Sequence, residues 1–140
     1  MNETPGASDP TVVRSIAVTT DDLISALEAN RRANSHVVLR VTPPFYARER
    51  ARIHLTGGEV ADYADPPPLH FDPETFLDET APAYPEVDET RPDPYELEAH
   101  HERHTAAVES WRTSIRSHLR DTVELSAGDV SHEVDVKYLG

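Results

Sequence analysis

The stretch "PFYARERARIHL", residues 44–55, concentrates positive charge within an acidic chain. Five side chains with binding chemistry occupy alternate positions along it: Tyr46, Arg48, Arg50, Arg52 and His54. In an extended strand, alternate side chains share one face and lie about 6.8 Å apart. Guanidinium groups in such a row can bind carboxylates or phosphates, and aromatic rings beside them can stack on bases. The pattern predicts a partner-binding face, which Arg40 of the preceding apolar run extends.

The distribution of charge leaves three interpretations of this face open. Residues 59–102 hold 14 acidic residues and one arginine, whereas residues 1–58 have a net charge of +1. The arginines could therefore meet only solvent, be covered by the chain's own acidic segment, or bind a protein or nucleic-acid partner. In high salt, simple phosphate binding is weakened because counterion release contributes little there.

A second group of candidate residues lies in "EAHHERH", residues 98–104, and just before it. Glu96, His100 and His104 are spaced so that a helix brings them to one face, and two histidines with a carboxylate suit a zinc ion. The segment lacks the H-E-x-x-H spacing of zinc proteases. An alternative is that His101 and His104 belong to an apolar helix stripe. The histidines therefore predict, as the second functional class, a metal-dependent enzyme.

Other catalytic chemistry finds no support in the sequence. The chain has no cysteine and only five glycines. It contains no G-x-S-x-G, phosphate-binding loop or dinucleotide-binding glycine pattern. We therefore predict no catalytic residue and no cofactor, and favour a non-enzymatic binding or accessory protein.

The composition points to a salt-adapted cytoplasm. Acidic residues number 26 against 13 basic ones, and Lys137 is the single lysine. Carboxylates retain water and hydrated cations, which long lysine side chains do not. No apolar run approaches the roughly 20 residues that span a bilayer. Residues 1–10 are polar and lack the apolar core of a signal peptide. We expect a halophilic cytoplasmic protein without membrane association.

The periodicity predicts one α+β domain over residues 11–140, after a disordered tail at 1–10. Residues 11–58 form its β-α-β-β unit. The β-branched run at 11–18 predicts a strand, and the segment from residue 19 to 34 has the charge placement of a helix. Strands at 36–41 and 44–55 follow. The first two strands are expected to pair in parallel, and the third to return antiparallel along the second.

The second half of the chain predicts a connector, a helix and a strand. Residues 59–92 form an acidic, proline-rich connector with one helical turn near residues 73–77. Asp93 as N-cap and Pro94 at the first helical position predict a helix over 93–123. Residues 130–139 alternate valine with polar residues and predict a terminal strand.

The predicted helix carries an apolar stripe along its whole length: Leu97, His101, His104, Val108, Trp111, Ile115, Leu119 and Val123. A helix of about 30 residues is about 45 Å long, which exceeds what a small sheet can cover. The stripe over 97–123 therefore predicts self-association as a homodimer.

Residues 13–55 resemble a family of small uncharacterised haloarchaeal proteins of the domain-of-unknown-function kind. The resemblance is carried by "VLRVTPPF", by the alternating arginine strand after it, and by "PLHFDPE" downstream. It covers about half of the chain. The resemblance implies a haloarchaeal cytoplasmic origin, and it transfers no activity and no site residue.

Overall fold

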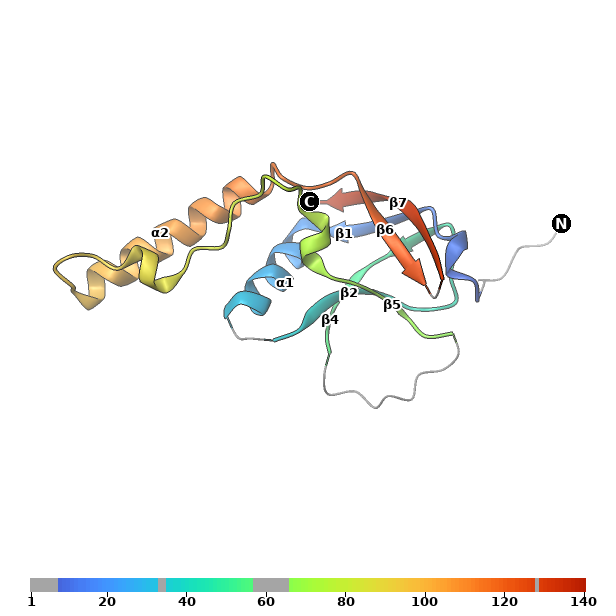
Figure 1. The fold of residues 1–140 in the computed structure, drawn as a ribbon, viewed down its shortest axis with the longest axis horizontal. Coiled ribbons are helices and arrows are strands. Elements are labelled where there is room, and N and C mark those ends of the chain that lie inside the picture. The colour runs from blue at the N-terminus through green and yellow to red at the C-terminus, as the bar shows by residue number, and fades with distance from the viewer. Residues whose placement is uncertain (1–7, 33–34, 57–65, 128) are drawn as a thin grey trace. The chain divides into compact units, whose positions relative to one another are not determined.

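The structure is a computed structural model that describes residues 8–32, 35–56, 66–127 and 129–140. The chain divides into two compact units. The sheet unit comprises Met1–Phe76 and Arg120–Gly140, and the helix unit comprises Leu77–Leu119. The strands and helix α1 belong to the sheet unit, and helix α2 belongs to the helix unit (Figure 1). This mixture of elements confirms the predicted α+β class.

The first three elements of the sheet unit follow the predicted order: β1 (Ser15–Thr19), α1 (Thr20–Arg32) and β2 (Val37–Val41). The Thr19 hydroxyl accepts the Asp22 backbone N–H at 3.0 Å, which satisfies an otherwise unpaired donor at the start of α1. The predicted first strand begins later than expected, because a short 3-10 helix precedes it.

The strands form two sheets. The remaining strands are β3 (Arg48–Arg50), β4 (Arg52–Leu55), β5 (Leu69–Phe71), β6 (Thr122–Ala127) and β7 (Val130–Leu139). The four-stranded sheet has the order β3-β1-β7-β6, and the three-stranded sheet has the order β4-β2-β5. The predicted parallel pairing of the first two strands is therefore wrong. Instead, β7 lies parallel to β1 and places Val136 beside Ile16, so that both side chains are buried.

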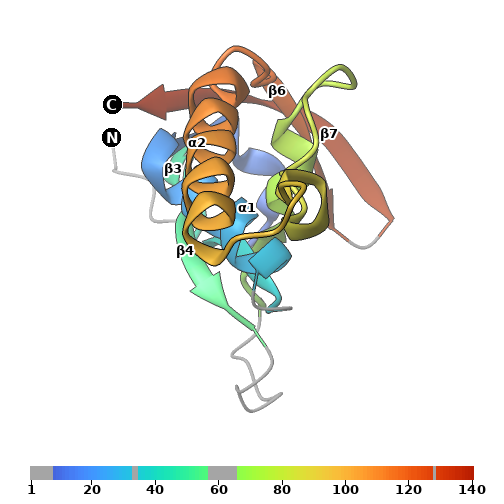
Figure 2. The ribbon, with the colours of Figure 1, turned by 90° about the vertical axis from the view of Figure 1, so that its left-hand side faces the viewer.

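The predicted strand over residues 44–55 is divided at Ala51. Its first part, β3, pairs in parallel with β1, and its second part, β4, pairs antiparallel with β2 as predicted. Ala51 is fully buried, and its N–H donates to the Ala17 carbonyl at 2.9 Å. The chain thus leaves one sheet and enters the other within a single residue, and Figure 2 shows β3 and β4 following one another.

The core of the sheet unit lies between α1 and the strands. Helix α1 packs against β1, β2 and β4, and it buries Leu23, Ile24, Ala26 and Leu27. The return from α1 into β2 is held by Asn30, whose side chain accepts the Val37 N–H at 2.6 Å and donates to the Val37 carbonyl at 2.9 Å. This side-chain amide takes the place of a strand neighbour at the start of β2.

The helix of the helix unit, α2 (Leu97–Ile115), is shorter than the predicted helix over 93–123 at both ends. Its N-cap is Glu96, whose carboxylate accepts the Ala99 N–H at 3.2 Å, and Asp93 lies outside the helix. At the other end, residues 122–127 form β6, because alternating Val123 and Leu125 are buried in the sheet. The terminal strand β7 and the helical turn at Pro73–Phe76 match their predictions.

The buried face of α2 differs from the predicted stripe. His100, Val108, Trp111 and Ile115 are buried, whereas Leu97 is 71% exposed and His101 is exposed. The stripe turns with the 3.6-residue period of the helix, so His100 replaces His101 on the inner side.

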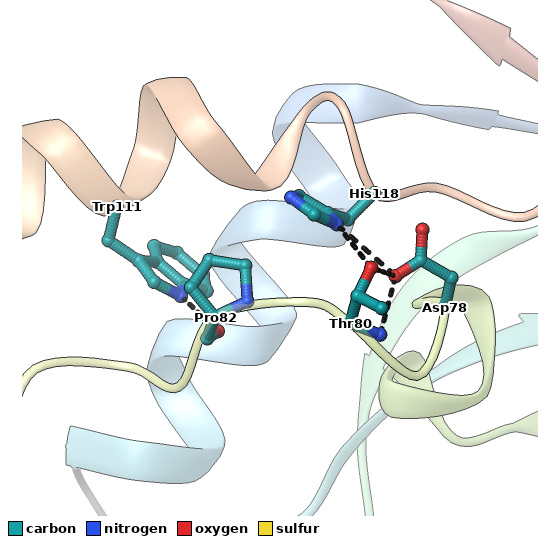
Figure 3. Close-up of polar contacts among 5 residues, drawn as sticks. All are labelled: Asp78, Thr80, Pro82, Trp111 and His118. Atoms are coloured by element: carbon teal, nitrogen blue, oxygen red, sulfur yellow. Dashed lines mark hydrogen bonds and ion pairs between the residues drawn. The ribbon is translucent and has the colours of Figure 1, made fainter.

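The chain covers part of this stripe with its own residues. The Trp111 indole N–H donates to the Pro82 carbonyl at 3.1 Å (Figure 3), and its ring lies 4.9 Å from that of Tyr84. The predicted homodimer required an exposed seam along the stripe. Burial of Trp111, Val108 and Ile115 in the single chain removes the central part of that seam.

Candidate functional site: the basic sheet face

The sheet register shows where the five alternating side chains lie. Arg48 and Arg50 are opposite Ser15 and Ala17 of β1, while Arg52 is opposite Arg40 of β2. Arg48 and Arg52 are exposed. Residues that are opposite one another in a ladder share a face of the sheet. The structure therefore brings Arg40 beside the arginine strand, as the sequence interpretation expected.

A basic row crosses the three-stranded sheet at Arg40. Arg52 of β4 is its partner on one side, and His70 of β5 is its partner on the other. His54 is one alternate position along β4 from Arg52, and its Nδ1 lies 3.0 Å from Arg40 Nη1. The His54 and His70 rings have centroids 5.6 Å apart. We call these four residues the basic row.

His70 is the residue of this site that sequence reasoning missed. The sequence predicts one helical turn and no strand within the connector over 59–92. In the structure, "LHF" at Leu69–Phe71 forms β5 with a buried, exposed, buried pattern. That alternation is too short to distinguish a strand from a loop without a partner strand.

Glu49 interrupts the alternating pattern of the arginine strand for a structural reason. Its carboxylate accepts the Tyr46 backbone N–H at 2.7 Å and so closes the turn that leads into β3. Burial raises the pKa of the Glu49 carboxyl, against the lowering effect of that hydrogen bond. Tyr46 itself is 49% exposed, so its ring is accessible next to the arginines.

The three arginines of residues 48–52 differ from Arg31 in their ion pairing. Among the described residues of the sheet unit, none of Arg48, Arg50 and Arg52 lies within ion-pairing distance of a carboxylate. In contrast, Arg31 of α1 pairs with Glu74 at 3.1 Å. The part of the acidic connector described in this unit, residues 66–76, therefore pairs with α1 and not with the strand.

Acidic side chains lie beyond β1 on the face of the four-stranded sheet that carries Arg48. Ser15 lies between Arg48 on one side and Asp135 of β7 on the other. Strands are about 4.8 Å apart, so Asp135 is about 10 Å from the arginine strand. Further along, Glu133 of β7 is opposite Glu124 of β6. Lys137 of β7 is on this face too, beside Ala17, whose other neighbour is Arg50. Beyond β1 the face therefore carries both signs of charge.

The predicted metal ligands are each engaged in local contacts of the helix unit. Glu96 caps α2, His100 Nε2 lies 2.8 Å from the Val87 carbonyl oxygen, and His104 Nδ1 lies 3.1 Å from the Thr90 hydroxyl. Within the described ranges, no three His, Asp or Glu side chains are grouped so that they could hold a metal ion. The geometry explains His100 and His104 as anchors of the 3-10 helix Val87–Thr90.

A further polar cluster joins the two ends of the helix unit. The Asp78 carboxylate lies 3.2 Å from His118 Nδ1 and accepts the Thr80 hydroxyl at 2.8 Å (Figure 3). The Asp78 N–H also donates to the His118 carbonyl at 2.9 Å. Hydrogen bonding from Thr80, with a smaller contribution from His118, lowers the pKa of the Asp78 carboxyl. We call this cluster the clasp, because it ties residues 78–80 to residue 118.

Comparison with known proteins identifies the family of the chain and no function. Neither described helix combines the length and apolar composition that a membrane span requires. The comparison with curated proteins returned no match, and the comparison with solved structures also returned none. A family model described as a domain of unknown function (DUF8009) matches residues 2–140. The chain therefore belongs to the DUF8009 family.

Proposed function

We propose that this chain is a non-enzymatic binding protein of a halophilic cytoplasm, whose basic sheet face binds an acidic segment of a protein partner. One observation carries the proposal: Arg48 and Arg50 of β3 and Arg52 of β4 follow one another along the chain without an ion pair among the described residues of their unit. Arg40 is opposite Arg52 in the ladder, and His54 is two residues from Arg52 along β4, which supports including both in the face. Arg48 and Arg52 are exposed and Arg50 is half-buried. The exposed guanidinium groups are available to an external carboxylate or phosphate.

A protein partner fits the extent of this face better than nucleic acid does. A nucleic-acid strand carries one phosphate per nucleotide and requires a long basic track. Here the carboxylates of Asp135 and Glu133 begin two strands away on the same face. The net charge of −13 repels a polyanion further. A short acidic protein segment needs only the three or four arginines that the face provides.

The proposal is tested with a triple variant in which Arg48, Arg50 and Arg52 become Gln. The matched control changes three exposed arginines elsewhere to Gln: Arg32, Arg103 and Arg116. Both variants change the net charge equally. The probes are a fluorescent poly-aspartate peptide and a single-stranded RNA of equal charge, each titrated at several KCl concentrations.

We expect the poly-aspartate peptide to bind the native chain and the control, and to lose most of its affinity for the strand variant. Melting temperatures should stay close to native in both variants, since exposed charges contribute little to stability. Equal peptide binding by the strand variant and the control would overturn the proposal. Tighter binding of RNA than of the peptide would assign the face to nucleic acid instead.

A further inference from the structure

Strand β6 lies at one edge of the four-stranded sheet, and its ladder with β7 shows which of its backbone groups point outward. The Val136 N–H donates to the Asp121 carbonyl at 2.8 Å, in the same register as the pairs of β6 and β7. Bonded and non-bonded pairs alternate along an antiparallel ladder, so the bonded positions of β6 are 123, 125 and 127. The N–H and C=O groups of Thr122, Glu124 and Ser126 therefore point away from β7.

These outward groups form an open edge. In the described part of the chain, no backbone or side-chain atom is hydrogen-bonded to them. The chain pairs with this edge just before β6, where the Arg120 N–H donates to the Phe76 carbonyl at 2.8 Å. The residues before Phe76 form a 3-10 helix, so they cannot continue this pairing along β6. An open edge of this kind can accept an added strand from another chain.

Two hollows lie along the edge. A mostly apolar hollow of about 410 Å³ is at the end of β6, lined among others by Phe45, Leu69 and Ser126. A second hollow of about 390 Å³ is at the start of β6, lined among others by Thr75, Arg120, Glu124 and Glu133. Hollows beside an edge strand can receive the alternate side chains of an added strand, which gives such sites their specificity.

The side chains of β6 indicate which strand fits. Glu124 is opposite Glu133, and both are exposed, so a basic residue added opposite Glu124 would relieve their repulsion. The alternate positions of an added strand share the face of Val123 and Leu125, which are buried, and so suit apolar side chains. We propose that the β6 edge binds an extended segment of a partner protein in which basic residues alternate with apolar ones.

A second copy of this chain fits the edge less well. The fullest antiparallel overlap of two β6 edges places Glu124 opposite Glu124 of the second copy, and like charges in this position destabilise a strand pair. Each chain also has a net charge of −13. The proposed site is separate from the basic sheet face, because β3 is at the opposite edge of the four-stranded sheet and the two ligands have opposite charges.

The test uses the full chain and a fluorescent peptide in which three lysines alternate with two valines. In the proposed register, the lysine N–H groups face β6 and the valine N–H groups face away. Two derivatives keep the charge but carry N-methyl groups on the backbone nitrogens of either the lysines or the valines. Methylation at the lysines should weaken binding by a factor of about ten or more, and methylation at the valines should change it little. Equal effects of the two derivatives would overturn the proposal.

Two variants of the protein alter the edge. Ser126→Pro removes an outward N–H and spares the ladder with β7, in which that N–H takes no part. Glu124→Lys reverses the charge opposite a lysine of the peptide, and Glu102→Lys, at an exposed position of α2, is the control with the same change in net charge. Peptide affinity should fall about tenfold in Ser126→Pro and about five- to tenfold in Glu124→Lys, and stay close to native in the control. Equal affinity of Glu124→Lys and Glu102→Lys would contradict the proposed charge pairing.

Amide hydrogen exchange identifies the occupied edge directly. Peptide binding should slow exchange at Thr122, Glu124 and Ser126, whereas Val123 and Leu125 are already bonded to β7 and should change less. Peptide binding without this alternating pattern would overturn the proposal. Slow exchange at the three outward amides in the chain alone would overturn it too. It would assign the edge to a second copy if the protection grew with protein concentration, and to another part of the same chain if it did not.

Discussion

Reversing the charge of Arg52 should stabilise the protein, although it adds to an excess of negative charge. In Arg52→Glu, the repulsive pair with Arg40 becomes an attractive cross-strand pair. Cross-strand charge pairs contribute about 0.2–1 kcal/mol, and the exposure of Arg52 favours the lower half of that range. Removing a repulsion and adding an attraction should together raise the free energy of unfolding by about 0.5–1 kcal/mol.

The matched control is Arg48→Glu, which changes the net charge by the same amount. Arg48 is opposite Ser15, and Asp135 lies on the far side of that serine, so a glutamate there gains no cationic partner. We expect it to be neutral or slightly destabilising. The two variants are compared by urea unfolding at the lowest KCl concentration that supports folding, and again at high KCl.

The difference between Arg52→Glu and Arg48→Glu should correspond to a melting temperature about 2–4 °C higher for the first. It should shrink as KCl rises, because salt screens exposed charges. If the two variants unfold at the same urea concentration in low salt, or if Arg52→Glu is the less stable, then Arg40 and Arg52 do not repel one another across the ladder and the argument for the basic row fails.

Three further predictions concern the helix unit and the whole chain. Trp111→Ala should destabilise the helix unit by about 3–5 kcal/mol and increase proteolysis within residues 77–119. Trp111→Phe keeps an aromatic ring but loses the hydrogen bond to the Pro82 carbonyl, so it should lower the free energy of unfolding by only about 1 kcal/mol. Because the pKa of Asp78 is lowered in the folded chain, the clasp stabilises the helix unit above about pH 4, and this contribution is lost as the pH falls through the folded-state pKa. Hydrogen exchange at residues 78–80 should therefore rise in acid. The rise should be less steep in Asp78→Asn. Because the net charge is −13, the melting temperature should fall when molar KCl is removed, and an unchanged value would contradict a halophilic origin.

Much of the local structure could be predicted from the sequence, because it depends on neighbours a few residues apart. Asp21 and Asp22 in the first turn, with Arg31 and Arg32 in the last, indicate both ends of α1. The alternation of valines from residue 130 predicts β7. The alternation of arginines places their side chains on a common face whichever strand they pair with.

Two of the errors in the prediction concern contacts between distant parts of the chain. A strand pattern at residues 15–19 does not specify its neighbours, and β7, more than 100 residues later, pairs with it. The predicted helix was extended to residue 123 because Val123 fits a helical period. It fits a strand period equally well, and burial beside β7 decides in favour of the strand.

The candidate site, too, has features set by neighbouring residues and features set by contacts between distant strands. The sequence by itself determined that Arg48, Arg50 and Arg52 alternate and that the chain around them is acidic. Only the tertiary structure decided that Arg40 lies between Arg52 and His70, and that the arginines change sheets at Ala51. Charge and periodicity are properties of adjacent residues, whereas register is set by the burial of apolar side chains across strands. A shift of the register by one residue would move every one of these side chains to the opposite face.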